Sequence, residues 1–170
     1  MAETTEQYIA RITGYVAGKD HFKVYQATPK KLRALAKKAT GKKMTKRPAP
    51  DKWSIAEIIT HLAESELVIA FRLRMILATN GILIQVADQT AWQANAGHLI
   101  KDPKKALELF ETFRAYNVAL LKSISKERWE AYGMHEERGK ESVRRVVEMY
   151  AGHDVNHMLQ IEGILNGTRK

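Results

Sequence analysis

Two histidines four residues apart form the segment of this sequence that is best suited to chemistry. His153 and His157 lie in the run Tyr150-Ala-Gly-His-Asp-Val-Asn-His-Met-Leu-Gln-Ile161. Residues at i and i+4 share a helix face, so the two imidazoles could bind one metal ion. At about 100° per residue, His157 falls within the apolar stripe of this segment and His153 on its shoulder, while Asp154 lies near its centre. An unpaired carboxylate there would be costly, so these polar side chains require partners or a function.

A structural role is the alternative for the histidine pair, because an inward histidine is commonly a core residue that is hydrogen-bonded to a carbonyl group. A third ligand would favour a metal site. The chain has no cysteine, so that ligand must be His, Asp or Glu. His61 is the candidate, since it lies on the edge of the apolar stripe of a second long amphipathic segment. Three histidines with a fourth position open to water are typical of catalytic zinc sites rather than structural ones.

The composition is that of one basic globular domain spanning residues 1–170. The chain carries a formal net charge of +9, much of which lies between Lys19 and Lys52. This charge raises nucleic acid or an acidic ligand as a partner. Within residues 29–40, however, the basic residues alternate with Leu32, Leu35 and Ala36, which favours a solvated helix face followed by a basic loop. The polar first residues and the lack of a long apolar run lead us to expect a cytoplasmic protein without a membrane span.

Helical periodicity dominates the chain, and caps, prolines and glycines delimit the expected helices. The clearest start is at Ser54, which forms a capping-box pattern with Glu57 and is flanked by the apolar pair Trp53 and Ile58. The expected helices cover residues 7–16, 28–40, 54–80, 102–121 and 142–166, with short helices around 88–94 and after Ser125. The only strand candidate, residues 81–86, is short, and residues 136–140 are expected to be a polar loop. The sequence therefore predicts an all-α fold, a four-helix bundle with additional short helices in its connections.

Two of these segments together resemble the DinB/YfiT-like superfamily. The resemblance rests on Lys52-Trp53-Ser54-x-x-Glu57-x-x-x-His61-Leu62-x-x-x-Glu66 and on Tyr150-x-x-His153-Asp154-x-x-His157-x-x-Gln160-Ile161. Weaker similarities between them are Asp88-x-x-x-Trp92, Arg114 and His135-x-x-x-Gly139. The match covers about residues 48–166.

The resemblance implies a fold, a metal site and a class of reaction. Proteins of this superfamily are up-down-down-up four-helix bundles, often dimeric, and three histidines matching His61, His153 and His157 bind one divalent ion, usually zinc or nickel. Their characterised relatives include transferases that use the thiols bacillithiol or mycothiol, and a maleylpyruvate isomerase. We therefore expect a metal-dependent enzyme acting on a small molecule, most plausibly a low-molecular-weight-thiol S-transferase or a related hydrolase or isomerase. The alternatives are a non-catalytic bundle that binds a metal and a small ligand, and a basic DNA-associated stress protein. Sequence-specific binding of nucleic acid is not expected.

Four further polar residues are candidates for supporting roles. Glu66 and Asp154 could accept hydrogen bonds from the N–H groups of the ligating histidines; the alternative is a structural bond to the Trp53 indole or to the backbone. Arg72 could bind a substrate carboxylate, although a surface ion pair is the more ordinary role. His21, His98 and His135 are expected to face solvent, and His135 has the best chance of approaching the site.

Overall fold

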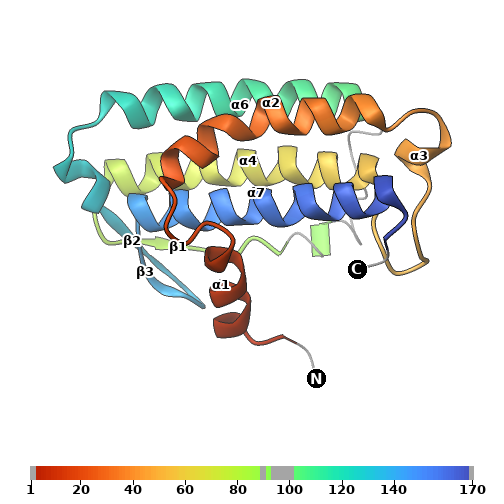
Figure 1. Cartoon of the computed structure of the whole chain (residues 1–170). Coiled ribbons are helices and arrows are strands. Elements are labelled where there is room, and N and C mark those ends of the chain that lie inside the picture. The colour runs from red at the N-terminus through yellow and green to blue at the C-terminus, as the bar shows by residue number, and fades with distance from the viewer. Residues whose placement is uncertain (1–2, 89–90, 93–101, 169–170) are drawn as a thin grey trace.

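The computed structural model describes residues 3–88, 91–92 and 102–168, and four long helices form its body. These are α2 (His21–Lys38), α4 (Ile55–Ala78), α6 (Pro103–Ser123) and α7 (Val143–Asn166). Figure 1 shows α4 and α6 running in one direction, and α2 and α7 in the other. The order along the chain is therefore up-down-down-up, and the expected four-helix bundle is confirmed.

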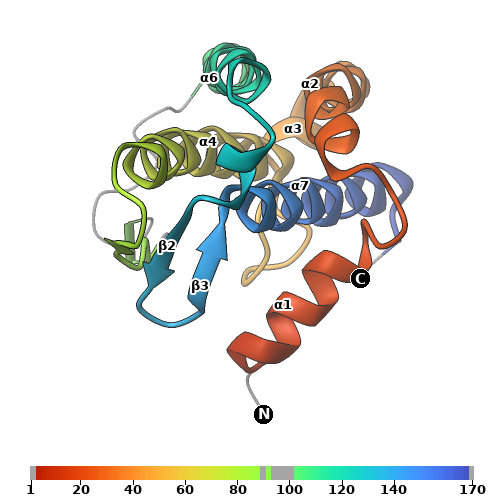
Figure 2. The ribbon, with the colours of Figure 1, turned by 90° about the vertical axis from the view of Figure 1, so that its left-hand side faces the viewer.

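The bundle packs as two layers, which Figure 2 shows end on. α2 and α6 form one layer and α4 and α7 the other. Each helix packs on two others, in the pairs α4 with α6, α2 with α7, α4 with α7 and α2 with α6. Ile59, Leu62, Phe110 and Ile161 are fully buried or nearly so between them. Within the described part of the chain, no helix combines the length and the apolar composition that a membrane span requires.

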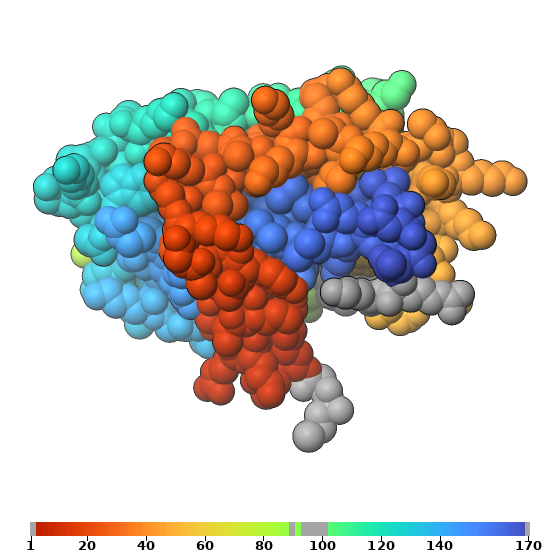
Figure 3. All heavy atoms as spheres, in the orientation of Figure 1, coloured from red at the N-terminus to blue at the C-terminus, as the bar shows by residue number. Residues whose placement is uncertain are grey.

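A short helix, α1 (Thr5–Gly14), lies outside the bundle against α7. It forms the projection at the lower edge of the molecule in Figure 3. Its close approach depends on Gly152, because a Cβ atom at this position would lie 2.1 Å from the carbonyl oxygen of Ile12. α1 was expected at residues 7–16 but begins earlier, since Thr4 and Gln7 form a capping box. The contact places α1 beside His153, the next residue along α7.

A small three-stranded sheet lies beside the helices, and only its first strand falls in the candidate segment at residues 81–86. Its strands are β1 (Ile82–Ile84), β2 (Tyr132–His135) and β3 (Gly139–Ser142). β1 pairs parallel with β2, and β2 pairs antiparallel with β3. Strands of three or four residues are too short to show the two-residue periodicity by which strands are recognised. The expected polar loop at 136–140 is the turn of the β2–β3 hairpin, where Gly139 has a φ of 71°.

The N-terminus of α2 was also placed wrongly, because Pro29 lies inside the helix instead of starting it. The helix begins at His21, and Asp20 caps it by accepting from the Lys23 N–H. A proline within a helix removes the hydrogen bond to the carbonyl four residues earlier, here that of Tyr25. Arg114 Nη1 donates to this carbonyl oxygen at 2.6 Å. A side chain from another helix thus replaces the missing backbone donor.

The remaining boundaries agree closely with the sequence. α4 has the expected capping box between Ser54 and Glu57, α6 begins at Pro103 after the Asp102 cap, and α7 ends before Gly167. A one-turn helix α3 (Lys42–Thr45) lies in the expected basic loop, and a 3-10 turn η1 (Glu127–Glu130) follows α6. Of the short helix expected at 88–94, Ala91 and Trp92 are helical, Asp88 precedes them without regular structure, and the other residues lie outside the described part of the chain.

Candidate metal centre

The structure brings the three histidines from two helices to one point. His61 projects from α4, and His153 and His157 project from successive turns of α7. His153 Nε2 lies 3.1 Å from the Nε2 atoms of both His61 and His157. One ring nitrogen from each of the three histidines lies within 4.8 Å of the ring nitrogens of the other two. Three nitrogens about 2.0 Å from a single tetrahedral ion would be about 3.3 Å apart, so the cluster fits one divalent metal.

The surroundings keep the imidazoles of His153 and His157 in the neutral form that binds metals. Burial and the neighbouring histidines hold the pKa of His153 well below its usual value. Burial lowers the pKa of His157 to about 4, although its bond to Gln160 opposes the shift. Gln160 Oε1 lies 2.9 Å from His157 Nδ1. A carbonyl oxygen can only accept, so Nδ1 carries the proton and Nε2 keeps its lone pair toward the cluster.

Aromatic side chains cover the cluster on two sides. The Trp53 ring lies 4.7 Å from the His61 ring and stacks on that of His157 at 6.2 Å between centroids. On the other side the Tyr150 ring lies 5.9 Å from that of His153. The sequence indicated Trp53 only as an apolar residue beside the helix cap. The same cap that starts α4 therefore also positions a wall of the site.

Glu66 and Asp154 belong to a buried network centred on Arg114. Arg114 Nη2 lies 2.7 Å from Glu66 Oε2 and 2.8 Å from Asp154 Oδ2. Tyr25 and Asn117 donate to Glu66 Oε1 at 2.5 and 2.8 Å. Within the described residues neither carboxylate is hydrogen-bonded to a histidine ring, and His153 Nδ1 is buried there without a hydrogen-bond partner.

In the structure Glu66 and Asp154 thus pair with Arg114, a partner that the sequence did not indicate. Residues of all four long helices meet in this network, and burial raises the pKa of Asp154 to about 6 against the effect of Arg114. Arg114 was singled out by the resemblance alone. Tyr25 and Asn117 were missed because a tyrosine or asparagine on a helix carries no distinguishing pattern.

Arg72 and His135 are both buried, which corrects two expectations. Arg72 is 7% exposed and donates to the Gln85 carbonyl oxygen at 2.9 Å and to the Tyr150 hydroxyl at 3.3 Å. His135 is 3% exposed, because pairing of β2 with β1 holds it against α4, where its Nε2 lies 3.4 Å from Arg72 Nη2. Burial, followed by the charge of Arg138, lowers the His135 pKa to about 4. His21 is partly buried, 4.0 Å from Glu148, and His98 lies outside the described residues.

Two small cavities reach the histidines, one at His153 and the other at His157. One, of about 180 Å³, is bounded by Tyr8 of α1, by Arg72, by the hairpin residue Glu137 and by His153. The other, of about 220 Å³, lies between Trp53 and His157. The arrangement could hold an ion through three nitrogens and admit a small molecule beside it.

Fold and site together define a four-helix bundle that carries an inward-facing three-histidine cluster. The family model of the DinB superfamily matches residues 25–161, and the chain belongs to this superfamily. The solved structure of YfiT from Bacillus subtilis, described as a probable metal-dependent hydrolase with an unusual four-helix bundle topology, superposes with a TM-score of 0.79. It is 18% identical, with 98% of this chain and 90% of that chain covered.

Curated relatives are similar over most of the bundle. The "Putative metal-dependent hydrolase" of Oceanobacillus iheyensis is 24% identical over 112 residues, 66% of this chain and 64% of that protein. YfiT of Bacillus subtilis, which bears the same description, is 21% identical over 140 residues, 81% of this chain and 78% of that protein. The chain thus spans slightly less than two thirds of the length of the first of these relatives.

Proposed function

We propose that this protein is a divalent-metal-dependent enzyme whose ion is held by His61, His153 and His157. The observation that carries the proposal is the convergence of three imidazole nitrogens from α4 and α7. Imidazole ligands suit zinc and nickel, and three protein ligands leave a position for a reacting molecule. The descriptions of the relatives as metal-dependent hydrolases support the same class of protein.

The chemistry of such a site follows from the ion and from the residues around it. A divalent ion with an open position acts as a Lewis acid and lowers the pKa of a bound water or thiol. The three histidines would hold it, and Trp53 and Tyr150 flank the cluster and limit the access of water. Arg72 brings positive charge to the cavity beside His153.

For the reaction, we propose transfer of a low-molecular-weight thiol to a small electrophile. Bacillithiol, glutathione and cysteine carry carboxylates, which the net positive charge of the chain would attract. Hydrolysis is the second candidate, because the relatives are described as hydrolases; it differs in using water as the nucleophile. We further propose, from the family resemblance, a cytoplasmic homodimer that does not recognise specific nucleic-acid sequences.

Metal content tests the site directly. Protein purified without chelators and incubated with zinc or nickel should carry about one ion per chain by elemental analysis. His157→Ala should lose the ion, because only two of the three imidazole ligands remain. His21→Ala is the matched control, since it makes the same change away from the cluster, and it should keep the ion. Metal-free wild-type protein after both incubations would refute the proposal.

Turnover separates the candidate reactions. Metal-loaded and chelator-treated protein would be assayed with monochlorobimane and bacillithiol, mycothiol, glutathione or cysteine, and in parallel with ester and amide substrates without thiol. Metal-dependent conjugation supports the transferase, and metal-dependent hydrolysis without thiol supports the hydrolase. Retention of the ion with neither activity would identify a non-catalytic ligand-binding bundle.

A further inference from the structure

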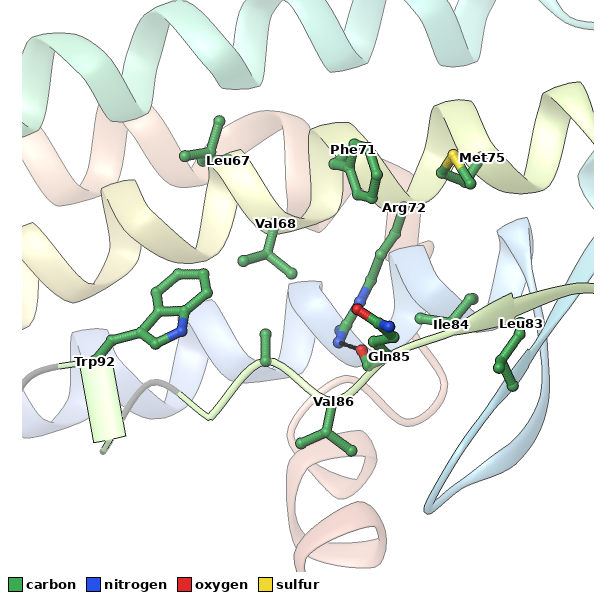
Figure 4. A pocket seen from close by; sticks show the side chains of 11 residues that line it. Leu67, Val68, Phe71, Arg72, Met75, Leu83, Ile84, Gln85, Val86 and Trp92 are labelled. Atoms are coloured by element: carbon green, nitrogen blue, oxygen red, sulfur yellow. Dashed lines mark hydrogen bonds between the residues drawn. The ribbon is translucent and has the colours of Figure 1, made fainter.

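A larger, mainly apolar cavity lies beside the metal centre, on the outer side of α4. Its volume is about 690 Å³, within the range of small-molecule sites. Figure 4 shows it between α4 and the segment that follows β1, with Trp92 at one end. Among its walls are several apolar side chains that are more than one third exposed, namely Leu67, Phe71, Leu83, Val86 and Trp92. An exposed cluster of this kind commonly marks a binding site.

Arg72 joins this apolar cavity to the metal centre. Arg72, Val86 and Ala87 line both the apolar cavity and the smaller cavity that reaches His153. Figure 4 shows the Arg72 side chain crossing from α4 to the Gln85 carbonyl. A molecule in the apolar cavity would therefore meet the guanidinium on its way to the histidines.

Among the described residues, no carboxylate pairs with the charge of Arg72. All 19 Asp and Glu residues lie in the described part of the chain, and none forms an ion pair with Arg72. Its contacts are a carbonyl, a phenol and an imidazole, all neutral. Arg114, which is buried in the same bundle, has two carboxylates. Burying a charge without a counter-charge is costly, so an anionic ligand would complete the site.

The ring of His135 strengthens this argument. The Glu137 backbone N–H donates to His135 Nδ1 at 3.2 Å. With its lowered pKa the ring is neutral near pH 7, so its proton then lies on Nε2. Nε2 faces Arg72 Nη2 at 3.4 Å, donor toward donor. An acceptor bound at the guanidinium would relieve this arrangement.

We propose that the apolar cavity binds a substrate with an aromatic or acyl body and a carboxylate that pairs with Arg72. The proposal rests on the function proposed above, because it places the reacting part of this molecule toward His153. The volume of the cavity sets the size of the apolar body. The guanidinium of Arg72 selects for a substrate that carries a negative charge.

A pair of probes that differ only in charge tests this assignment. N-phenyl-1-naphthylamine, which fluoresces in apolar sites, would be displaced by 2-naphthoate or by its neutral analogue 2-naphthamide. Charge-assisted hydrogen bonds are about twice as strong as neutral ones. Half-displacement of the dye by the naphthoate should therefore require roughly one tenth of the concentration that the naphthamide requires. Arg72→Met should remove this preference while the dye still binds. Arg74→Met, the matched control on the same helix but outside the cavity, should keep it.

Two further measurements make the result decisive. Leu83→Asp should weaken binding of the dye, and in wild-type protein 2-naphthoate should shift the ring resonances of His135 but not those of His21. Equal displacement by the two probes, or failure of the dye to bind, would overturn the proposal. The proposal would also be overturned if the dye did not bind and Leu83→Asp dissociated a dimer of the protein. The cavity would then be an interface between two copies of the chain.

The metal and the ligand can fail independently. The displacement series would be run on metal-loaded and on chelator-treated protein. A naphthoate preference that survives Arg72→Met but disappears on chelation would place the carboxylate on the metal and overturn the role of Arg72. A preference that persists in wild-type protein without any bound ion would support the cavity while refuting the proposed metalloenzyme.

Discussion

Replacing Arg114 with methionine should destabilise the bundle more than any exposed charge replacement. Arg114 is 1% exposed and binds Glu66, Asp154 and the Tyr25 carbonyl oxygen, with its guanidinium 3.5 Å from the Tyr25 ring centroid. Removing one partner of a buried ion pair costs about 3–5 kcal/mol. The Tyr25 carbonyl, already without its helical donor because of Pro29, would lose its substitute, at about 1–3 kcal/mol.

The low ends of these ranges sum to about 4 kcal/mol, a large part of the 5–15 kcal/mol by which domains are typically stable. For a chain of this length, about 2–4 °C in Tm per kcal/mol gives a decrease of roughly 8–16 °C. Urea denaturation followed by circular dichroism measures the free energy, and calorimetry measures Tm. Arg33→Met is the matched control. Arg33 pairs with Glu111 across the same helices α2 and α6 but at the surface, where an ion pair contributes about 0–1 kcal/mol.

A loss for Arg114→Met no larger than that for Arg33→Met would refute this reasoning. If Arg114→Met does not fold, Glu66→Gln provides a milder test, because it keeps the shape of the side chain while removing its charge and turning one acceptor oxygen into a donor. Glu66→Gln should still destabilise by more than 1 kcal/mol, since a hydrogen bond to a charged group is worth about 1.5–3 kcal/mol. A neutral effect of that substitution would show that the carboxylate in the network is dispensable.

Three further predictions concern the metal, the pH dependence and nucleic acid. Chelation should remove the ion without loss of the helical circular dichroism signal, because the apolar core is complete without it; unfolding on chelation would contradict this. His135 has a folded-state pKa of about 4, below the value of about 6.5 for an unfolded histidine. Its stabilising contribution is therefore present above pH 6.5 and is lost as the pH falls toward 4, so His135→Gln in chelator-treated protein should flatten the decline of stability over this range. An unchanged slope would exclude His135 as its source. Duplex DNA should bind only weakly and with a steep dependence on salt, and tight binding to one sequence at physiological salt in a fluorescence anisotropy titration would contradict this.

Features that depend on short stretches of sequence could be predicted. The cap at Ser54, the Asp102-Pro103 start and the Gly167 stop each act within one helical turn, and the structure has them as expected. Pro29 was misleading because the propensity argument considers the helix alone. Its cost is offset by a donor 85 residues away in the sequence, and a local pattern contains no information about Arg114.

The same distinction between local and distant information explains the site. The spacing of His153 and His157 places them on one helix face, the apolar stripe of residues 54–80 made His61 a candidate third ligand, and the family resemblance supported this choice. Arg72 was a candidate from the sequence, but its environment was not predictable, because it depends on the Gln85 carbonyl and on His135, which a strand too short to recognise carries to α4. The contrast between two buried arginines is therefore visible only in three dimensions. Arg114 is neutralised by Glu66 and Asp154 and holds the helices together, whereas Arg72 has no such partner in the described part of the chain and faces a cavity. Because carboxylates of the bundle neutralise Arg114 but not Arg72, we expect the anionic group of a ligand to bind at Arg72.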